Sequence, residues 1–261
     1  MKSKSLTSFA LASTLALASV GSLSAATIFT DNAGNYGGGW TNGSNGGTGF
    51  GAWTITSSGG TGFAGAFIGD PTSAGITGMS TTSFGLYANP LSSGAFAIAE
   101  RSFANPLGVG DSFSFQWGIN WDSGTGGNKG FSLYSGGTGG TELINLNNAG
   151  SSDITINGNN VGFGYGTAAM TWTITRTSET NLQVEATNRD VSLTAAPNYS
   201  GNITISGTAA PDSFKFYASG MQGGNEAQPY FNNLTLTVVP EPSSLSLLAL
   251  SGLALLRRRR A

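Results

Sequence analysis

The clearest pattern in the chain is a strict alternation of apolar and polar residues between Asp111 and Asp122. Every second position is apolar: Phe113, Phe115, Trp117, Ile119 and Trp121. Successive side chains of a β-strand point to opposite faces, so this period of two predicts a strand with one apolar and one polar face. We therefore expect the apolar residues, Trp117 and Trp121 among them, to lie in the core.

The same kind of run recurs along the middle of the chain. Further candidate strands cover 53–56, 62–68, 83–87, 95–103, 131–134, 142–146, 153–157, 170–177, 182–186, 203–205, 214–216 and 234–238. Clusters of Gly, Asn and Ser separate them, as at 57–60 and 136–140. About a dozen short strands with no amphipathic helix predict an all-β domain, an antiparallel β-sandwich of the jelly-roll kind. In strand number and size it resembles the concanavalin A-like and laminin-G-like sandwiches.

The N-terminus has the three parts of a secretory signal peptide. Lys2 and Lys4 supply the positive start, residues 9–20 form an apolar run, and small residues lead up to Ala26. An amphipathic or buried first helix is the alternative, but the run has no polar face. We expect signal peptidase to cut after Ala26, which leaves an exported domain over residues 27–239.

The C-terminus combines a proline-flanked acid, an apolar segment and a basic end. Pro240, Glu241 and Pro242 precede the apolar residues 243–256, and four arginines follow: Arg257, Arg258, Arg259 and Arg260. A helix of this length spans roughly 21 Å, less than the ~30 Å of a hydrocarbon core. Arginines favour the cytoplasmic side. We expect a short transmembrane helix that holds the domain outside as a membrane-anchored intermediate.

This order of parts over residues 240–261 resembles the PEP-CTERM sorting signal of Gram-negative bacteria that make exopolysaccharide. The resemblance implies recognition by an exosortase, a membrane-embedded cysteine enzyme. It would cut near Pro240, Glu241 and Pro242 and release or transfer the upstream domain at the cell surface. A simple C-terminal anchor is the alternative interpretation.

Two residue types are missing from the whole sequence, which contains neither His nor Cys. Their absence excludes a Ser-His-Asp triad, a cysteine nucleophile, a histidine base and the usual zinc or iron sites. No disulfide can form either, so an exported domain must be stabilised by its core.

The charge balance changes once the two ends are set aside. Residues 27–239 keep five basic side chains against twelve carboxylates, a net charge of −7. An acidic domain repels phosphate backbones, so we expect no nucleic-acid partner.

Glycan binding needs an exposed aromatic ring beside amides and carboxylates. Gln116, Asn120 and Asp122 lie on the polar face of the strand described first, and Trp40, in a glycine-rich stretch, is the candidate exposed ring. The alternative places Trp40 over one edge of a sheet.

Calcium is the one metal that the oxygen-rich loops could hold. Asn120, Asp122 and Asn128 offer oxygen ligands of the type that Ca²⁺ prefers. Asn-Gly turns also explain this composition, so both interpretations stay open, and we expect no other cofactor.

No two carboxylates of residues 27–239 are two or four positions apart, although a hydrolase on such a sandwich usually carries paired acids. We therefore expect no enzyme. The prediction is a cell-surface or extracellular-matrix protein with a structural or glycan-binding role in exopolysaccharide. A secreted carbohydrate-active hydrolase and a calcium-stabilised adhesin are the alternatives.

Overall fold

The computed structural model describes residues 25–122, 126–162, 164, 166–187, 198–206 and 210–240. The predicted signal peptide up to residue 24 and the sorting tail from Glu241 onward, including the predicted transmembrane helix at 243–256, lie outside the described residues. Residues Ala26–Val239 form a compact unit with its own hydrophobic core. None of the helices described is both long enough and apolar enough to cross a bilayer.

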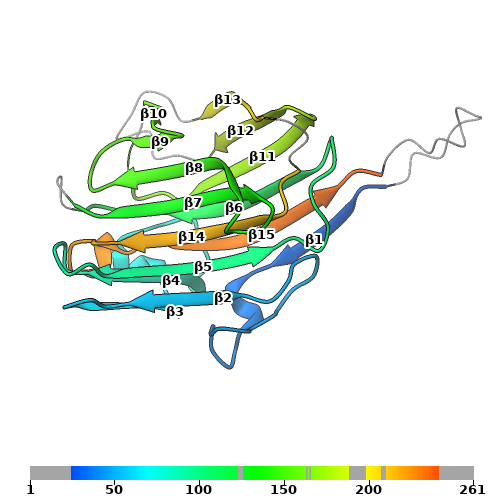
Figure 1. The fold of residues 1–261 in the computed structure, drawn as a ribbon. Coiled ribbons are helices and arrows are strands. Elements are labelled where there is room, and N and C mark those ends of the chain that lie inside the picture. The colour runs from blue at the N-terminus through cyan, green and yellow to red at the C-terminus, as the bar shows by residue number, and fades with distance from the viewer. Residues whose placement is uncertain are drawn as a thin grey trace, which may run out of the picture. The chain divides into compact units, whose positions relative to one another are not determined.

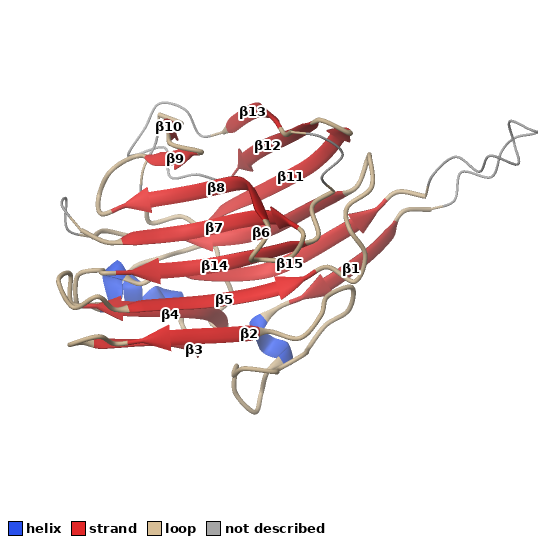
Figure 2. Cartoon of the chain, in the orientation of Figure 1, coloured by secondary structure: helices blue, strands red, loops and turns tan. Residues whose placement is uncertain are grey.

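The described residues fold into two antiparallel sheets, drawn in Figures 1 and 2. One sheet contains β1 (Thr27–Asp31), β3 (Phe63–Gly69), β4 (Ser83–Asn89), β6 (Ser112–Gly118), β11 (Met170–Ser178), β12 (Asn181–Thr187), β13 (Tyr199–Thr204) and β15 (Tyr230–Val238). The other contains β2 (Thr54–Ser58), β5 (Phe96–Ser102), β7 (Asn128–Ser135), β8 (Thr141–Ala149), β9 (Ile154–Ile156), β10 (Asn159–Asn160) and β14 (Ser213–Ser219). The short 3₁₀ helices are η1 (Ala33–Asn35), η2 (Pro71–Ala74) and η3 (Asn225–Ala227). The prediction of an all-β domain with antiparallel sheets is confirmed.

The order of strands brings sequence-distant segments together. The first sheet runs β13-β12-β11-β6-β15-β4-β3, with β1 beside β15, and the second runs β10-β9-β8-β7-β14-β5-β2. In Figure 1 the second sheet lies in front, and β2 and β3 run along the lower margin. Strand β3 is therefore the last strand at one edge of the first sheet.

The core between the sheets is rich in aromatic rings. Phe115 of β6 lies with its ring centroid 4.5 Å from that of Phe131 of β7, in a stacked arrangement across the sandwich. Trp117 has no exposed surface, as its place in the alternating stripe predicts. Trp121 is 40% exposed, so its predicted place in the core is wrong. Strand β6 ends at Gly118, and the alternation no longer determines the orientation of a side chain three residues later.

A buried polar network ties the first strand to the second sheet. Arg101 of β5 forms an ion pair with Asp31, the last residue of β1, and neither side chain is exposed. Tyr36 donates its hydroxyl to Asp31 and accepts from the indole N–H of Trp53 at 2.9 Å. The guanidinium also lies over the ring of Phe50, 5.0 Å from its centroid. The charge of Arg101 is therefore paired, hydrogen-bonded and stacked, as a buried charge requires.

Candidate ligand pocket

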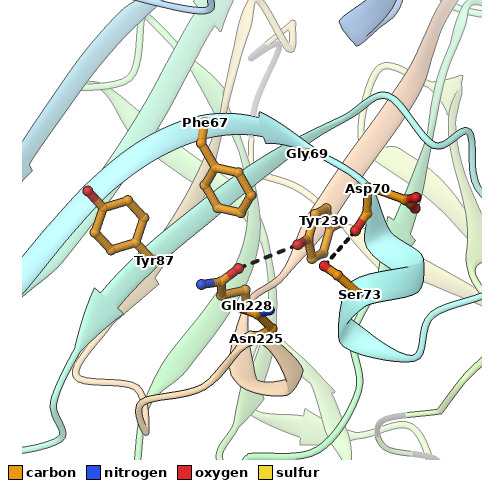
Figure 3. A pocket seen from close by; sticks show the side chains of 8 residues that line it. All are labelled: Phe67, Gly69, Asp70, Ser73, Tyr87, Asn225, Gln228 and Tyr230. Atoms are coloured by element: carbon orange, nitrogen blue, oxygen red, sulfur yellow. Dashed lines mark hydrogen bonds between the residues drawn. The ribbon is translucent and has the colours of Figure 1, made fainter.

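A pocket of about 350 Å³ opens where β3, β4, η2, η3 and the start of β15 meet. Its volume lies within the usual range for small-molecule sites. Eight residues line it: Phe67, Gly69, Asp70, Ser73, Tyr87, Asn225, Gln228 and Tyr230. Figure 3 shows Phe67 between Tyr87 and Tyr230, with Gln228 and Asn225 below these rings and Ser73 and Asp70 beyond Tyr230.

The aromatic side of the pocket consists of three rings from three strands. Phe67 of β3 packs edge-on against Tyr230 of β15, with ring centroids 5.6 Å apart, and lies 6.1 Å from the ring of Tyr87 of β4. Tyr230 is buried, whereas Phe67 and Tyr87 are half-buried. The pocket therefore offers two partly solvent-exposed rings on a buried third ring.

Glycines opposite each ring make this arrangement possible. In the antiparallel register of β3 and β4, Phe67 faces Gly85 and Gly65 faces Tyr87. A Cβ at Gly85 would lie 2.2 Å from the ring of Phe67, and one at Gly65 would lie 2.7 Å from the hydroxyl of Tyr87. Each ring therefore lies down over a bare backbone, an arrangement that only glycine permits.

The polar side of the pocket is built on the 3₁₀ helix η2. Asp70 caps this helix by accepting the amide hydrogen of Thr72 at 2.9 Å, and Ser73 donates to the carbonyl oxygen of Asp70 at 2.7 Å. Asn120 donates from its amide to the carbonyl oxygen of Ala74 at 2.6 Å and so holds the end of η2. These bonds hold η2 in place, and with it Asp70 and Ser73.

Tyr230 contributes a hydroxyl that stays protonated. It donates toward the amide oxygen of Gln228 at 3.4 Å, as Figure 3 shows. Burial raises the pKa of Tyr230, a hydrogen bond with Ser73 opposes that rise, and the nearby charge of Asp70 adds to it. The hydroxyl is therefore a neutral hydrogen-bonding group at physiological pH.

The chemistry of the lining selects among classes of ligand. The eight lining residues include one carboxylate, Asp70, and neither lysine nor arginine. A phosphate or a uronate would meet no cation here. Aromatic planes beside hydroxyl, amide and carboxylate oxygens instead suit a neutral polyol.

The residues predicted to bind glycan do not form one site. Trp40 is only 4% exposed and packs against Trp53 and Phe84, so the prediction of an exposed ring is wrong. Gln116 donates to the carbonyl oxygen of Gly78 at 3.2 Å, outside the pocket lining. Asn120 supports the pocket from behind, through η2, rather than lining it.

The predicted calcium ligands bond to three different parts of the protein. Asp122 forms a buried ion pair with Lys129, Asn120 holds Ala74, and Asn128 accepts a hydrogen bond from Asn147 at 3.0 Å. Within the described residues no group of three or more acidic side chains is placed to hold a metal ion. Calcium binding stays a prediction, and the ammonium of Lys129 already neutralises the one carboxylate involved.

Sequence reasoning missed Phe67, Tyr87 and Tyr230. The segment 62–68 shows no apolar-polar alternation, because glycine and alanine fill the positions around its aromatic residues. The sequence did contain a signal for them: aromatic residues alternate with glycine in the candidate strands 62–68 and 83–87. That pattern indicates rings that lie over glycines across a strand pair.

Comparison with known families identifies the C-terminal segment. Residues 238–260 match the model of the PEP-CTERM protein-sorting motif. The motif implies processing by an exosortase and an exported protein at the cell surface or outside the cell. No curated protein matches the sequence.

Several solved structures resemble the chain at low sequence identity. A lectin from Bauhinia forficata is 8% identical with a TM-score of 0.41, covering 81% of this chain and 98% of its own. Arcelin-5, a lectin-like defence protein from Phaseolus vulgaris, is 10% identical with a TM-score of 0.42, covering 82% and 100%. A protein of unknown function from Shewanella oneidensis is 9% identical with a TM-score of 0.43, covering 84% and 90%.

Proposed function

We propose that this protein is an exported, exosortase-sorted surface or matrix component that binds neutral glycans in the pocket of Phe67, Tyr87 and Tyr230. One observation carries the proposal: two half-buried rings, held flat over glycines, lie beside fixed hydroxyl, amide and carboxylate groups. The apolar face of a sugar ring stacks on such planes while its hydroxyls bond the polar groups. Exopolysaccharide of the producing cell is the glycan that the sorting route favours.

The composition of the pocket favours binding over hydrolysis. Glycoside hydrolysis uses two carboxyl groups about 5 to 10 Å apart across the scissile bond. Asp70 is the one carboxylate in the lining, and its Oδ1 atom already accepts from the amide of Thr72 and, at 2.8 Å, from its hydroxyl. A carbohydrate-active hydrolase therefore remains the second interpretation.

The proposal is tested by binding of residues 27–239 to an array of neutral and acidic oligosaccharides and to purified bacterial exopolysaccharide. We expect binding to neutral members, weakened about tenfold or more by Tyr87→Ala because a stacking ring is lost. Tyr199→Ala is the matched control, since its half-buried ring also covers a glycine, Gly201, and lies outside the pocket lining. Equal effects of the two variants, or no binding to any glycan, would refute the proposed site.

A further inference from the structure

Strand β3 forms an open edge of the larger sheet. Within the described residues it pairs only with β4, in an unbroken antiparallel register from Phe63–Asn89 to Gly69–Ser83. An edge strand leaves a row of backbone donors and acceptors without a partner strand.

The hydrogen bonds of β4 show which residues of β3 direct their backbone groups to the open edge. The amide of Leu86 donates to the carbonyl oxygen of Pro229 at 3.2 Å, and the carbonyl oxygen of Ala88 accepts from Met221 at 2.7 Å. Both groups therefore point away from β3. Opposed residues in an antiparallel pair either bond each other or both point outward. The partners of Leu86 and Ala88 on β3 are Ala66 and Ala64, so these two, with Ile68 in phase, direct their amides and carbonyls to the open edge.

This edge lacks the usual protection against pairing with another chain. Natural edges are blocked by lysine or other charges, by proline or by a β-bulge. The seven residues of β3, FAGAFIG, include no charge and no proline, and their register with β4 has no bulge. Phe63 at its start is 73% exposed, the highest value among the large exposed apolar residues described.

We propose that β3 is a self-association edge, at which two copies of this chain pair β3 with β3 in antiparallel orientation and join their large sheets. Two-fold symmetry requires that orientation if the two sheets are to be continuous. A register centred on Ala66 places Ala66 opposite its own copy and Ala64 opposite Ile68. All three residues that face the edge then exchange backbone hydrogen bonds with the second copy.

The side chains on the outer face fit the same register. It sets Phe63 opposite Gly69 and Phe67 opposite Gly65, which repeats the pairing of ring and glycine seen between β3 and β4. Asp70 is the carboxylate adjoining β3, and the two copies of Asp70 lie about 27 Å apart along the strands, beyond the Debye length in physiological salt. The exposed ring of Phe63 gains a partner, and the two Asp70 carboxylates stay far apart.

The unmodified chain allows a direct test, because residues 27–239 lie within the compact unit that has its own core. We expect sedimentation velocity to show a reversible dimer at micromolar concentration. Hydrogen exchange measured by NMR should slow at the amides of Ala64, Ala66 and Ile68 as the protein concentration rises. Exchange at β13, the strand at the opposite edge of the same sheet, should not change with concentration.

A charged edge should separate the copies. Phe63→Lys should raise the dimer dissociation constant about tenfold or more, because lysine protects natural edges. It should leave thermal unfolding of the monomer nearly unchanged, because Phe63 is mostly exposed. The matched control is Ile28→Lys, which introduces the same charge at a 63% exposed apolar residue of β1 and should leave the dimer intact.

Three results would overturn the proposal. A monomer at every concentration, with rapid exchange at the three β3 amides throughout, would exclude self-association. A dimer that is insensitive to Phe63→Lys would place the interface elsewhere. A dimer that Ile28→Lys weakens equally would assign the effect to general charge rather than to β3.

Discussion

Lys129 and Asp122 form an ion pair in which neither side chain has any exposed surface, with 2.7 Å between Nζ and Oδ2. The other carboxylate oxygen accepts the amide hydrogen of Gln222 at 3.0 Å. Burial lowers the pKa of Lys129, and the hydrogen bond and charge of Asp122 oppose that shift. The carboxylate of Asp122 therefore offsets part of the cost of burying the ammonium.

Removing the carboxylate of Asp122 should destabilise the folded domain. We expect Asp122→Ala to lower the free energy of unfolding by about 3 to 5 kcal/mol, because it leaves an uncompensated buried charge. Urea denaturation of residues 27–239 measures this. The double variant Asp122→Ala with Lys129→Met should recover part of the loss, and a loss below about 1 kcal/mol in the single variant would contradict the burial of the pair.

Calcium should not stabilise the domain through Asn120, Asp122 and Asn128. Because Lys129 neutralises Asp122, and Asn120 and Asn128 bond elsewhere, we expect the melting temperature to be the same in CaCl₂ and in EDTA. Differential scanning calorimetry under both conditions decides the matter. A higher melting temperature in calcium would restore the calcium-stabilised adhesin as the better interpretation.

The two tryptophans of the alternating stripe should differ in their contribution to stability. Trp117 is fully buried and stacks at 6.1 Å from Phe231, so Trp117→Ala should cost about 3 to 5 kcal/mol of unfolding free energy. The Trp121→Ala variant should lose less than about 1 kcal/mol of unfolding free energy, because 40% of the Trp121 surface is exposed. Equal losses in chemical denaturation would mean that the strand continues past Gly118 in solution.

Alkaline pH should unfold the protein through its buried tyrosines. Burial, and then the hydrogen bond to Asp31, raise the pKa of Tyr36 from its ordinary 10 to about 12. Between these values the unfolded chain has released a proton that the folded chain keeps, so stability falls as the pH rises. The contribution of Tyr36 to this loss should be at most about 2 to 3 kcal/mol, because solvent screening reduces it.

The Tyr36→Phe variant isolates that contribution. It removes hydrogen bonds at neutral pH, so its absolute stability will be lower, but its stability should fall less steeply than that of the wild type between pH 10 and 12. Urea denaturation at intervals across this range measures the slopes. Burial also raises the pKa of Tyr217, so a fall of the same sign should persist in the variant.

Deletion of residues 240–261 should separate sorting from folding. The compact unit ends at Val239, whose amide donates to Asp111 at 2.8 Å, so the truncated domain should keep its melting temperature. Sorting to the cell surface should be lost, because the deletion removes nearly all of the matched motif. Cell fractionation with immunoblotting measures this, and unchanged localisation would refute a sorting role for the tail.

The sequence predicted most of the strands because alternation reports directly on which side chains a sheet buries. The segment around Phe113 to Ile119 is the best example, and β11 and β12 follow the same rule. Strand β1 was not predicted, because its one fully buried residue is the charged Asp31. The partner of Asp31, Arg101, lies 70 positions away in the sequence. Local patterns carry no information about such a pair.

The site was predicted less well than the fold, and for a physical reason. The glycines around Trp40 predict an exposed ring, yet its burial depends on Trp53 and Phe84, which other segments supply. The pocket itself depends on the register of β3 against β4, which decides that Tyr87 lies over Gly65. Register is a tertiary property, and the pattern of a single sequence does not display it.

The pairing of Thr27 with Val238 joins the first strand of the domain to its last. Strand β15 also lies between β6 and β4, so within the described residues it joins the two halves of the large sheet. During synthesis and translocation the final stretch is the last to emerge. The large sheet can therefore close only after β15 has been made, so the domain completes its fold at the end of its own synthesis.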